Sequence, residues 1–434
     1  MKKVLILAYD FYPYNSIGAQ RPYSWYKYFH QNNLYPVVIT RHWDHEIKKP
    51  EDVIKPSKAE NTVKIESSNG TIIYTRFKPN LRDRILNKYG LNKYSFLRKS
   101  LTLFLNVFKY IFNIDTTKEI YKAANEILNK EKCDVIIATG EPFILFKYAS
   151  KLSSKHKIPW VADYRDGWTT EQAKKNTRGI EKILFSYYGI IESYYLKNVA
   201  LITTASPSYK HDLEKKFKSK KIEVIYNGYF SEIIDEVIAE EKLKKDNLFK
   251  IAYSGTLYDH QNLEMFLNGF KKFVTKTAVK NIKIYFYGLN FFPSQKKRVL
   301  DFDSELNKYF EFTDRLPMKS VLKELHNSDL LLLLSKKDAN WLNAKIFDYL
   351  ALNKKILLVE NDNGILEQIV DECNGGVKCE TAVDVFENLK LIYFSFKENG
   401  KVIQDTANFE KYSRENQTRI LADFILKLNT KSIN

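Results

Sequence analysis

Five consecutive leucines at positions 330–334 constrain the fold of this chain more than any other feature. An uninterrupted apolar run of this length is typical of a parallel strand with helices covering both of its faces. A second apolar run at 355–360 follows a polar loop and a segment at 343–353 that has helical periodicity. Strand, helix and strand in this order predict a βαβ unit and therefore an α/β fold.

The start of the 343–353 helix is a candidate binding site, because ligands of open α/β sheets bind beyond the carboxyl ends of the strands. We expect Asn343 as its N-cap, with Lys345 in the first turn and Asp348 three residues later. A cation in a first turn opposes the helix dipole, so a bound anion would explain Lys345. A carboxylate that accepts two hydroxyl hydrogen bonds beside a phosphate suits a nucleoside diphosphate. An ordinary surface ion pair between Lys345 and Asp348 explains the same pattern equally well.

The composition narrows the class of protein. A chain of 434 residues predicts two or three domains, and a formal net charge of +17 favours an anionic substrate, an anionic membrane surface or nucleic acid. No nucleic-acid motif supports the last of these. Three cysteines in so long a chain predict a reducing compartment. No stretch reaches the roughly 18 apolar residues of a membrane span, so we expect a cytoplasmic protein.

Strand and helix patterns alternate along the chain twice. The first series covers residues 1–220 and the second covers 221–408, and an amphipathic helix follows within 409–434. Repeated alternation of this kind predicts two domains, each with a parallel sheet.

The turn after the first predicted strand, at residues 10–21, is a second candidate site. Gly18 would let the backbone approach a ligand closely, and Arg21 is a candidate anion contact before a helix at 23–30. A single glycine is weak support for a phosphate loop, and an ordinary loop fits this turn as well.

Carboxylates gather after two later strands of the first domain. Glu141 follows the strand at 133–139, and Asp163, Arg165 and Asp166 follow the strand at 159–162. Because the carboxyl ends of parallel strands share one edge of a sheet, we expect these side chains near Gly18. Their composition is that of a binding or catalytic site. A turn whose charges pair only with one another is the alternative.

Residues 82–114 combine positive charge with an apolar segment. The segment at 101–114 is apolar almost all round, too short to span a bilayer, and suited to an interfacial helix beside anionic lipid. A buried core helix with a solvated basic lead-in is the alternative. The basic residues before it are Arg82, Arg84, Lys88, Lys93, Arg98 and Lys99.

Four segments together resemble the family 4 glycosyltransferases, which make bacterial surface polysaccharides. They are similar, in order, to the family's Asp-x-Arg-Asp-x-Trp, Pro-Asn-Gly, Gly-Arg or Gly-Thr, and Ser-Lys-x-Phe-Glu-Tyr-Leu-Ala segments. In this chain they are residues 158–168, Tyr226-Asn227-Gly228, Ser254-Gly255-Thr256 and residues 344–351.

The resemblance implies the GT-B fold, in which two Rossmann-like domains face each other across a cleft and a C-terminal helix crosses back. It implies an acceptor domain at 1–220, a donor domain at 221–408 and the returning helix within 409–434. The activity expected is transfer of a sugar from a nucleotide diphosphate sugar to a glycan or lipid-linked acceptor, with retention, in cell-surface polysaccharide synthesis.

The expected site residues fall into two groups. Asp163, Arg165, Asp166 and Glu141 are the catalytic candidates. The donor-binding candidates are Gly18, Arg21, Asn227, Gly255, Thr256, Lys345 and Asp348. No metal and no cofactor other than the donor co-substrate are expected, and residues 82–114 are the candidate membrane contact.

The chain also departs from the family pattern. Thr256 and Gln261 stand where many members carry an arginine and a lysine that grip the pyrophosphate, and Asn340 and Asp348 replace two glutamates. We expect Lys345, Arg165 and Arg21 to supply the missing positive charge.

Three alternatives stay open at this point. Asp301-Phe-Asp303 matches the metal-binding string of the other glycosyltransferase architecture, although it lies in a predicted helix. A sugar-nucleotide epimerase shares the GT-B architecture. A non-catalytic subunit of a polysaccharide-assembly complex would explain the departures at the pyrophosphate positions.

Overall fold

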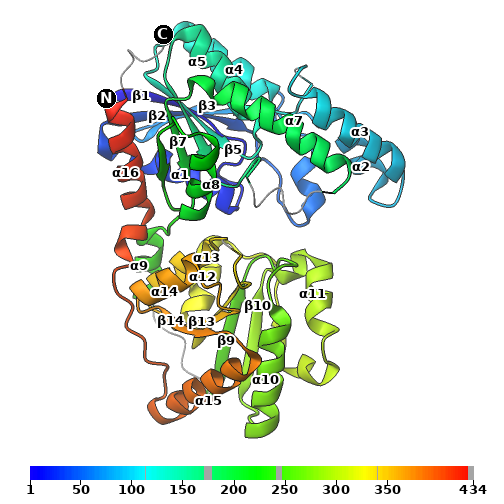
Figure 1. Ribbon diagram of the computed structural model, residues 1–434, viewed down its shortest axis with the longest axis vertical. Coiled ribbons are helices and arrows are strands. Elements are labelled where there is room, and N and C mark those ends of the chain that lie inside the picture. The colour runs from blue at the N-terminus through cyan, green and yellow to red at the C-terminus, as the bar shows by residue number, and fades with distance from the viewer. Residues whose placement is uncertain (113, 171–177, 241–246, 340, 429–434) are drawn as a thin grey trace. The chain divides into compact units, whose positions relative to one another are not determined.

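The structure is a computed structural model that describes residues 1–112, 114–170, 178–240, 247–339 and 341–428 (Figure 1). The chain divides into two compact units, which are described separately below. Unit 1 comprises residues 1–227 and 417–434, and unit 2 comprises residues 228–416. The division therefore falls after Asn227, later than the expected boundary at 220.

Unit 1 is built on a mainly parallel sheet with the strand order β3-β4-β2-β1-β5-β6-β7-β8. Its first strand is central, and the chain winds outward from β1 in one direction and then in the other, as in doubly wound folds. The edge strand β3 pairs antiparallel with β4. The strands are β1 (Lys2–Leu7), β2 (Leu34–Arg41), β3 (Val63–Ser67), β4 (Gly70–Thr75), β5 (Val135–Gly140), β6 (Trp160–Tyr164), β7 (Leu201–Thr204) and β8 (Ile222–Val224).

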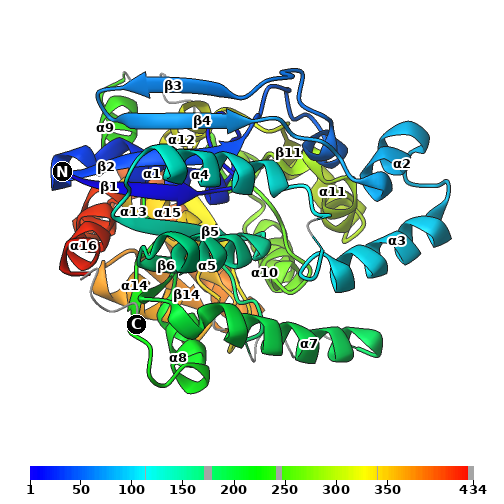
Figure 2. The ribbon, with the colours of Figure 1, turned by 90° about the horizontal axis from the view of Figure 1, so that it is seen from above.

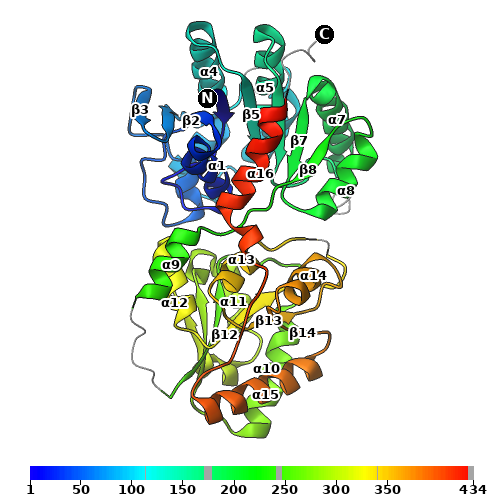
Figure 3. The same cartoon turned by 90° about the vertical axis from the view of Figure 1, so that its left-hand side faces the viewer.

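Helices cover both faces of this sheet. The described helices of unit 1 are α1 (Ile17–Tyr28), α2 (Leu81–Tyr89), α3 (Ser95–Phe108), α4 (Lys118–Lys130), α5 (Ile144–His156), α7 (Ile180–Tyr195), α8 (Pro207–Lys216) and α16 (Arg414–Lys427). Alternate residues of β1 point to opposite faces: Leu5 packs in the core that α4 and α5 share, and Ile6 packs in the core that α1 and α16 share. Figure 3 shows the C-terminal helix α16 against unit 1, where Leu421 and Ile425 are buried.

Unit 2 repeats the architecture with a parallel sheet in the order β11-β10-β9-β12-β13-β14. The five leucines at 330–334 form β12 and are all buried, which confirms the predicted strand. The strands are β9 (Phe249–Ser254), β10 (Ile282–Tyr287), β11 (Phe310–Phe312), β12 (Leu330–Leu334), β13 (Ile356–Val359) and β14 (Gly376–Cys379). The described helices are α9 (Ser231–Ala239), α10 (Leu263–Thr277), α11 (Pro293–Leu300), α12 (Met318–His326), α13 (Lys345–Ala351), α14 (Ile365–Glu372) and α15 (Ala382–Asn399).

Two helix boundaries that bear on the site differ from the sequence predictions. Helix α1 starts at Ile17 and not at residue 23, because Ser16 caps it by accepting a hydrogen bond from the Ala19 amide at 3.1 Å. Gly18 and Arg21 therefore lie on a helix and not in a loop. Helix α13 is shorter than expected, and its N-cap is Ala344 and not Asn343.

No helix in the described ranges combines the length and the apolar character needed to cross a membrane.

Candidate functional site

The sheet of unit 2 has its switch point between β9 and β12, where the chain changes winding direction. Ligands of doubly wound sheets bind at this point, beyond the carboxyl ends of the strands. Gly255 follows β9 there with φ +79, a conformation that L side chains rarely adopt. Its amide donates a 2.8 Å hydrogen bond to the Tyr287 carbonyl at the end of β10. The glycine therefore fixes a tight turn where a ligand would approach.

Lys345, on the first turn of α13, reaches over this turn. Its Nζ lies 3.9 Å from the centre of the Tyr253 ring and donates to the Thr256 carbonyl at 3.3 Å. A Cβ on Gly255 would lie 3.3 Å from the Lys345 Cε, so the glycine also makes room for the lysine. Burial lowers the pKa of Lys345 to about 7. No carboxylate among the described residues pairs with it, which leaves its charge free to neutralise a ligand.

Asp348, one helical turn along α13, carries a carboxylate that receives no hydrogen bond or ion pair within the described ranges. The surface pairing of Lys345 with Asp348 that the sequence allowed is therefore absent from the structure. Burial raises the pKa of Asp348 to about 7, and the charge of Arg414 opposes that rise. An acceptor of hydrogen bonds thus lies on the same short helix as an uncompensated cation.

Gln261, one of the positions that depart from the family pattern, has a structural role here. Gln261 is buried, and its Oε1 accepts from the Tyr258 amide at 2.9 Å and from the Tyr253 hydroxyl at 3.1 Å. Its Nε2 donates to the Leu334 carbonyl at 2.8 Å, so the amide is fully used within unit 2. Asn340 lies outside the described residues.

Arg315 is a cation that the sequence interpretation missed. It follows β11 at the same edge of the sheet, and its guanidinium lies 3.8 Å from the centre of the Phe291 ring. A Cβ on Gly288 would lie 3.7 Å from the Arg315 Cγ and 4.0 Å from the Gly255 Cα, so the arginine borders the Gly255 turn. Its position just after a predicted strand was the signal that could have identified it.

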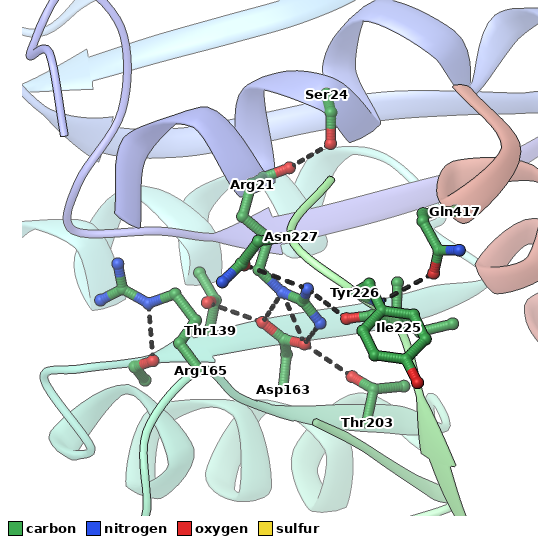
Figure 4. A network of polar contacts seen from close by, with 11 residues as sticks. Arg21, Ser24, Thr139, Asp163, Arg165, Thr203, Ile225, Tyr226, Asn227 and Gln417 are labelled. Atoms are coloured by element: carbon green, nitrogen blue, oxygen red, sulfur yellow. Dashed lines mark hydrogen bonds and ion pairs between the residues drawn. The ribbon is translucent and has the colours of Figure 1, made fainter. Parts of the chain in front are cut away.

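In unit 1, Asp163 and Arg21 form a buried ion pair (Figure 4). The Arg21 Nη2 and Nε donate to the two carboxylate oxygens at 2.6 and 3.0 Å. The hydroxyls of Thr139 and Thr203 donate to the same carboxylate at 2.8 and 2.7 Å. Both charged side chains are almost completely inaccessible to solvent. Every oxygen of Asp163 is thus already satisfied by protein groups.

The same network extends to Ile225 and Asn227, just before the chain enters unit 2. Arg21 Nη1 donates to the Ile225 carbonyl at 2.6 Å and to the Asn227 Oδ1 at 3.5 Å. The charge of Arg21 is therefore used within unit 1, contrary to the expectation that it replaces a missing pyrophosphate contact.

Arg165 lies beside this pair and packs against Gly18. Its Nε donates to the Gly140 carbonyl at 2.8 Å and its Nη2 to the Glu141 carbonyl at 2.6 Å. Its Nη1 lies 3.4 Å from a carboxylate oxygen of Asp10. A Cβ on Gly18 would lie only 1.6 Å from that Nη1. The glycine is required at this position so that the guanidinium can reach the strand ends.

Arg165 also lines a cavity of about 640 Å³ that lies within unit 1. Asp10, Lys109, Glu141 and Asp166 contribute to its polar wall. The pKa of Glu141 is raised, first by desolvation and then by the charge of Asp166. The structure thus brings Glu141, Arg165 and Asp166 together, and it adds Asp10 and Lys109, which the sequence interpretation missed. Asp163 is not part of this lining.

The two aspartates of the candidate metal string have other partners. Asp301 pairs with Lys297 at 2.6 Å and Asp303 pairs with Lys271 at 2.7 Å. Asp301 ends α11, and neither residue is at the end of a strand. Across the described ranges, no three His, Cys, Asp or Glu side chains form a group that could hold a metal ion.

Comparisons with known proteins agree with this architecture. Residues 109–230 match the family model described as Glycosyltransferase Family 4. No curated protein is similar enough in sequence to be identified as a relative.

Solved structures match over almost the entire chain. A glycosyltransferase from Rickettsia africae is 17% identical with a TM-score of 0.61, and 99% of each chain is covered. Sucrose-phosphate synthase from Thermosynechococcus elongatus is 9% identical with a TM-score of 0.58, covering 98% of this chain and 95% of the other. UDP-GlcNAc 2-epimerase from Methanocaldococcus jannaschii is 12% identical with a TM-score of 0.52, covering 98% and 99%. The likeness to these structures shows the GT-B fold, and the match over residues 109–230 relates that segment to glycosyltransferase family 4.

Proposed function

We propose that unit 2 binds a nucleoside diphosphate sugar through the edge formed by Gly255, Thr256, Lys345 and Asp348. Lys345 neutralises the diphosphate, and the Gly255 turn lets the phosphates approach the backbone. The Asp348 carboxylate accepts the hydroxyl hydrogen bonds of the ribose. One observation carries this assignment: an uncompensated cation and a carboxylate without a partner in the described residues lie together at the switch point of the sheet.

The catalytic contribution of unit 2 is electrostatic. Cleavage of the bond to the sugar leaves negative charge on the departing diphosphate, and a fixed cation beside it lowers the energy of that state. Lys345 is the first candidate for this role, and Arg315 is a second cation at the same edge.

The candidate acceptor site is the cavity in unit 1. Its carboxylates suit a glycan hydroxyl, which needs a hydrogen-bond acceptor and a base more than it needs a cation. Glu141 and Asp166 are the candidates to receive the proton of that hydroxyl, and Arg165 holds the strand ends in position. The buried network of Arg21, Asp163 and Asn227 supports the strand ends that carry these groups. It does not touch the substrate.

We assign the reaction to transfer onto a glycan or lipid-linked acceptor in cell-surface polysaccharide synthesis, with retention at the anomeric carbon. The likeness of the four sequence segments to family 4 enzymes supports this assignment. Three free, buried cysteines are compatible with work in the cytoplasm, at the inner face of the membrane.

The first experiment compares the Asp348→Ala variant with an Asp371→Ala control. Asp371 is an exposed carboxylate of unit 2 that pairs with Lys378, so its loss leaves the proposed site intact. Titration calorimetry with UDP, GDP, ADP and dTDP should identify one nucleotide that binds the wild type. Asp348→Ala should weaken that binding about tenfold or more, because a hydrogen bond to a charged group contributes about 1.5–3 kcal/mol. Equal affinity in both variants would remove Asp348 from the donor site.

The products distinguish transfer from epimerisation, which the shared fold does not. A transferase forms a glycosylated acceptor and nucleoside diphosphate. An epimerised sugar nucleotide or its elimination product, formed without acceptor, would instead assign the epimerase activity.

A further inference from the structure

Helix α3 and its flanks carry an unusual share of the exposed apolar surface. More than half of the large exposed hydrophobic side chains in the described part of the chain lie in residues 81–114 and on α7. On α3 itself no residue is buried, and Phe96 is 85% exposed and Phe104 50% exposed. The predicted alternative of a buried core helix at 101–114 is therefore wrong for its helical part.

The polarity of α3 is reversed relative to an ordinary surface helix. At 100° per residue, Phe96, Leu97, Leu103 and Phe104 lie on one broad face. The opposite face carries Thr102, Leu105 and Asn106, and these three residues line the cavity of unit 1. A surface helix of a globular protein normally turns its apolar stripe inward. Here a mixed face borders the cavity, and the face that carries Phe96, Leu97, Leu103 and Phe104 is left uncovered.

Positive charge accompanies this apolar face. Residues 82–99 carry six cations and a single carboxylate, Asp83, which pairs with Arg82 at 2.7 Å. Figures 1 and 2 both show α2 and α3 at one side of unit 1, away from α16. Tyr187 and Tyr188 of α7 hold the end of α3 through hydrogen bonds to the carbonyls of Val107 and Asn106, at 2.7 and 3.2 Å. The helix is thus anchored to unit 1 while its apolar face stays exposed.

We propose that the apolar face of α3 inserts into the headgroup region of an anionic lipid bilayer, with the neighbouring lysines and arginines on the lipid phosphates. Charge complementarity selects this occupant, because an apolar stripe flanked by cations suits an anionic interface. In a second copy of this chain, by contrast, the same face would bring six cations against six cations.

The position of α3 gives this surface a role in the reaction. In this arrangement α3 lies between the cavity of unit 1 and the lipid. An acceptor anchored in the bilayer therefore has to extend only past this helix to reach the cavity. This step rests on the proposed acceptor role of that cavity, whereas docking to lipid does not. The substrate class expected is therefore a glycan whose anchor stays in the membrane.

The test uses the full chain and a double variant, Phe96→Ser with Phe104→Ser. Its matched control is Leu391→Ser with Phe394→Ser, two exposed apolar residues of α15 in unit 2. Co-sedimentation is measured with vesicles of phosphatidylcholine alone and of phosphatidylcholine with 30% phosphatidylglycerol, a composition chosen at roughly the anionic content at which basic clusters bind. The wild type and the control should bind the anionic vesicles. The double variant should bind about ten- to a hundredfold more weakly, because it lacks two phenyl groups that are partly buried in the bilayer when the wild type binds.

A wild type that ignores anionic vesicles, or a double variant that binds them as well as the control, would overturn the proposal. Self-association of the wild type that the double variant abolishes, measured by light scattering without lipid, would assign the surface to a second copy and overturn it equally. Nucleotide binding, measured on the same samples, reports separately on the proposed donor site. Loss of lipid binding with intact nucleotide binding therefore tests this surface alone.

Discussion

The two units place charged side chains at equivalent positions, the carboxyl edge of a parallel sheet, but partner them differently. In unit 1, the Asp163 carboxylate accepts four strong hydrogen bonds. Arg21 donates hydrogen bonds to Asp163 and to the Ile225 carbonyl. In unit 2, burial lowers the pKa of Lys345 to about 7 and raises that of Asp348 to about 7, although the charge of Arg414 opposes the second shift. The first arrangement stabilises a fold, whereas the second is unfavourable until a ligand completes it.

Breaking the buried pair of unit 1 should have the largest effect. Asp163→Asn removes the charge that balances Arg21 in a site without solvent, and loss of one partner of a buried pair costs about 3–5 kcal/mol. We expect a marked fall in melting temperature. Asp166→Asn, an exposed neighbour three residues along, should change stability little. An Asp163→Asn variant that keeps the wild-type melting temperature but loses turnover would instead place Asp163 in the chemistry.

Removing the uncompensated cation of unit 2 should weaken ligand binding without lowering stability. Lys345→Met should weaken nucleoside diphosphate binding about ten- to a hundredfold, since it removes a charge-assisted hydrogen bond. Its melting temperature should stay equal or rise, because a buried charge without a partner disfavours the folded state. Calorimetry and thermal unfolding measure the two quantities on one sample. A destabilised variant with normal affinity would assign Lys345 a structural role and remove the contrast between the units.

Gly18 tests the contact between α1 and Arg165. In Gly18→Ala the new methyl group would overlap the Arg165 guanidinium, which must then leave the Gly140 and Glu141 carbonyls. We expect turnover to fall about tenfold, the lower end of the effect of a misplaced catalytic group. Stability should change little, because alanine favours a helix over glycine by up to about 1 kcal/mol.

Gly189→Ala is the matched control for that variant. Gly189 also lies on a helix, α7, but a Cβ there meets only the Lys216 Nζ, at 3.8 Å. The control should keep full turnover. Equal turnover in both variants would show that Arg165 does not need its present position.

The pH dependence of turnover should show the smallest effect. Asp348 must be ionised to accept hydroxyl hydrogen bonds, so its raised pKa of about 7 removes activity as the pH falls below 7. Lys345 must be protonated to bind phosphate, so its lowered pKa of about 7 removes activity as the pH rises above 7. The profile of kcat/KM, which reports the free enzyme, should be a narrow bell that falls about threefold from pH 7 to pH 6 or pH 8. A flat profile across this range would mean that neither group titrates as the geometry indicates.

Sequence patterns predicted the sheets because buried parallel strands are apolar on both faces, as at 330–334. They also placed the candidate residues at strand ends. They could not show which strand-end charges are already satisfied. Thr139, Thr203 and Arg21 lie 24, 40 and 142 positions from Asp163, and only the strand order brings them together. An isolated Asp-x-Arg-Asp segment gives no sign that its first aspartate is buried while its last is exposed.

Local rules misplaced two helix starts for identifiable reasons. The first helix was expected to start at residue 23, directly after Pro22, and proline lacks the amide hydrogen that a helix interior uses. The structure accommodates Pro22 inside α1, which Ser16 caps and which starts six residues before the expected start of the helix. Asn343 looked like an N-cap, and its Oδ1 does accept from the Lys345 amide, at 3.3 Å. The helix nevertheless starts after Ala344. Both errors concern the residue at which a helix starts, which determines where Gly18 and Lys345 lie on their helices.

The packing of α16 has a consequence for the order in which this protein is made. Leu421, Ala422 and Ile425 are buried against the first strands of the chain, so the core of unit 1 stays incomplete until these three residues have left the ribosome. Unit 2 ends at residue 416, before the buried residues of that helix, and can complete its own core first. The half of the protein that is synthesised first is therefore the half that matures last, and a premature stop near residue 416 would damage the amino-terminal half.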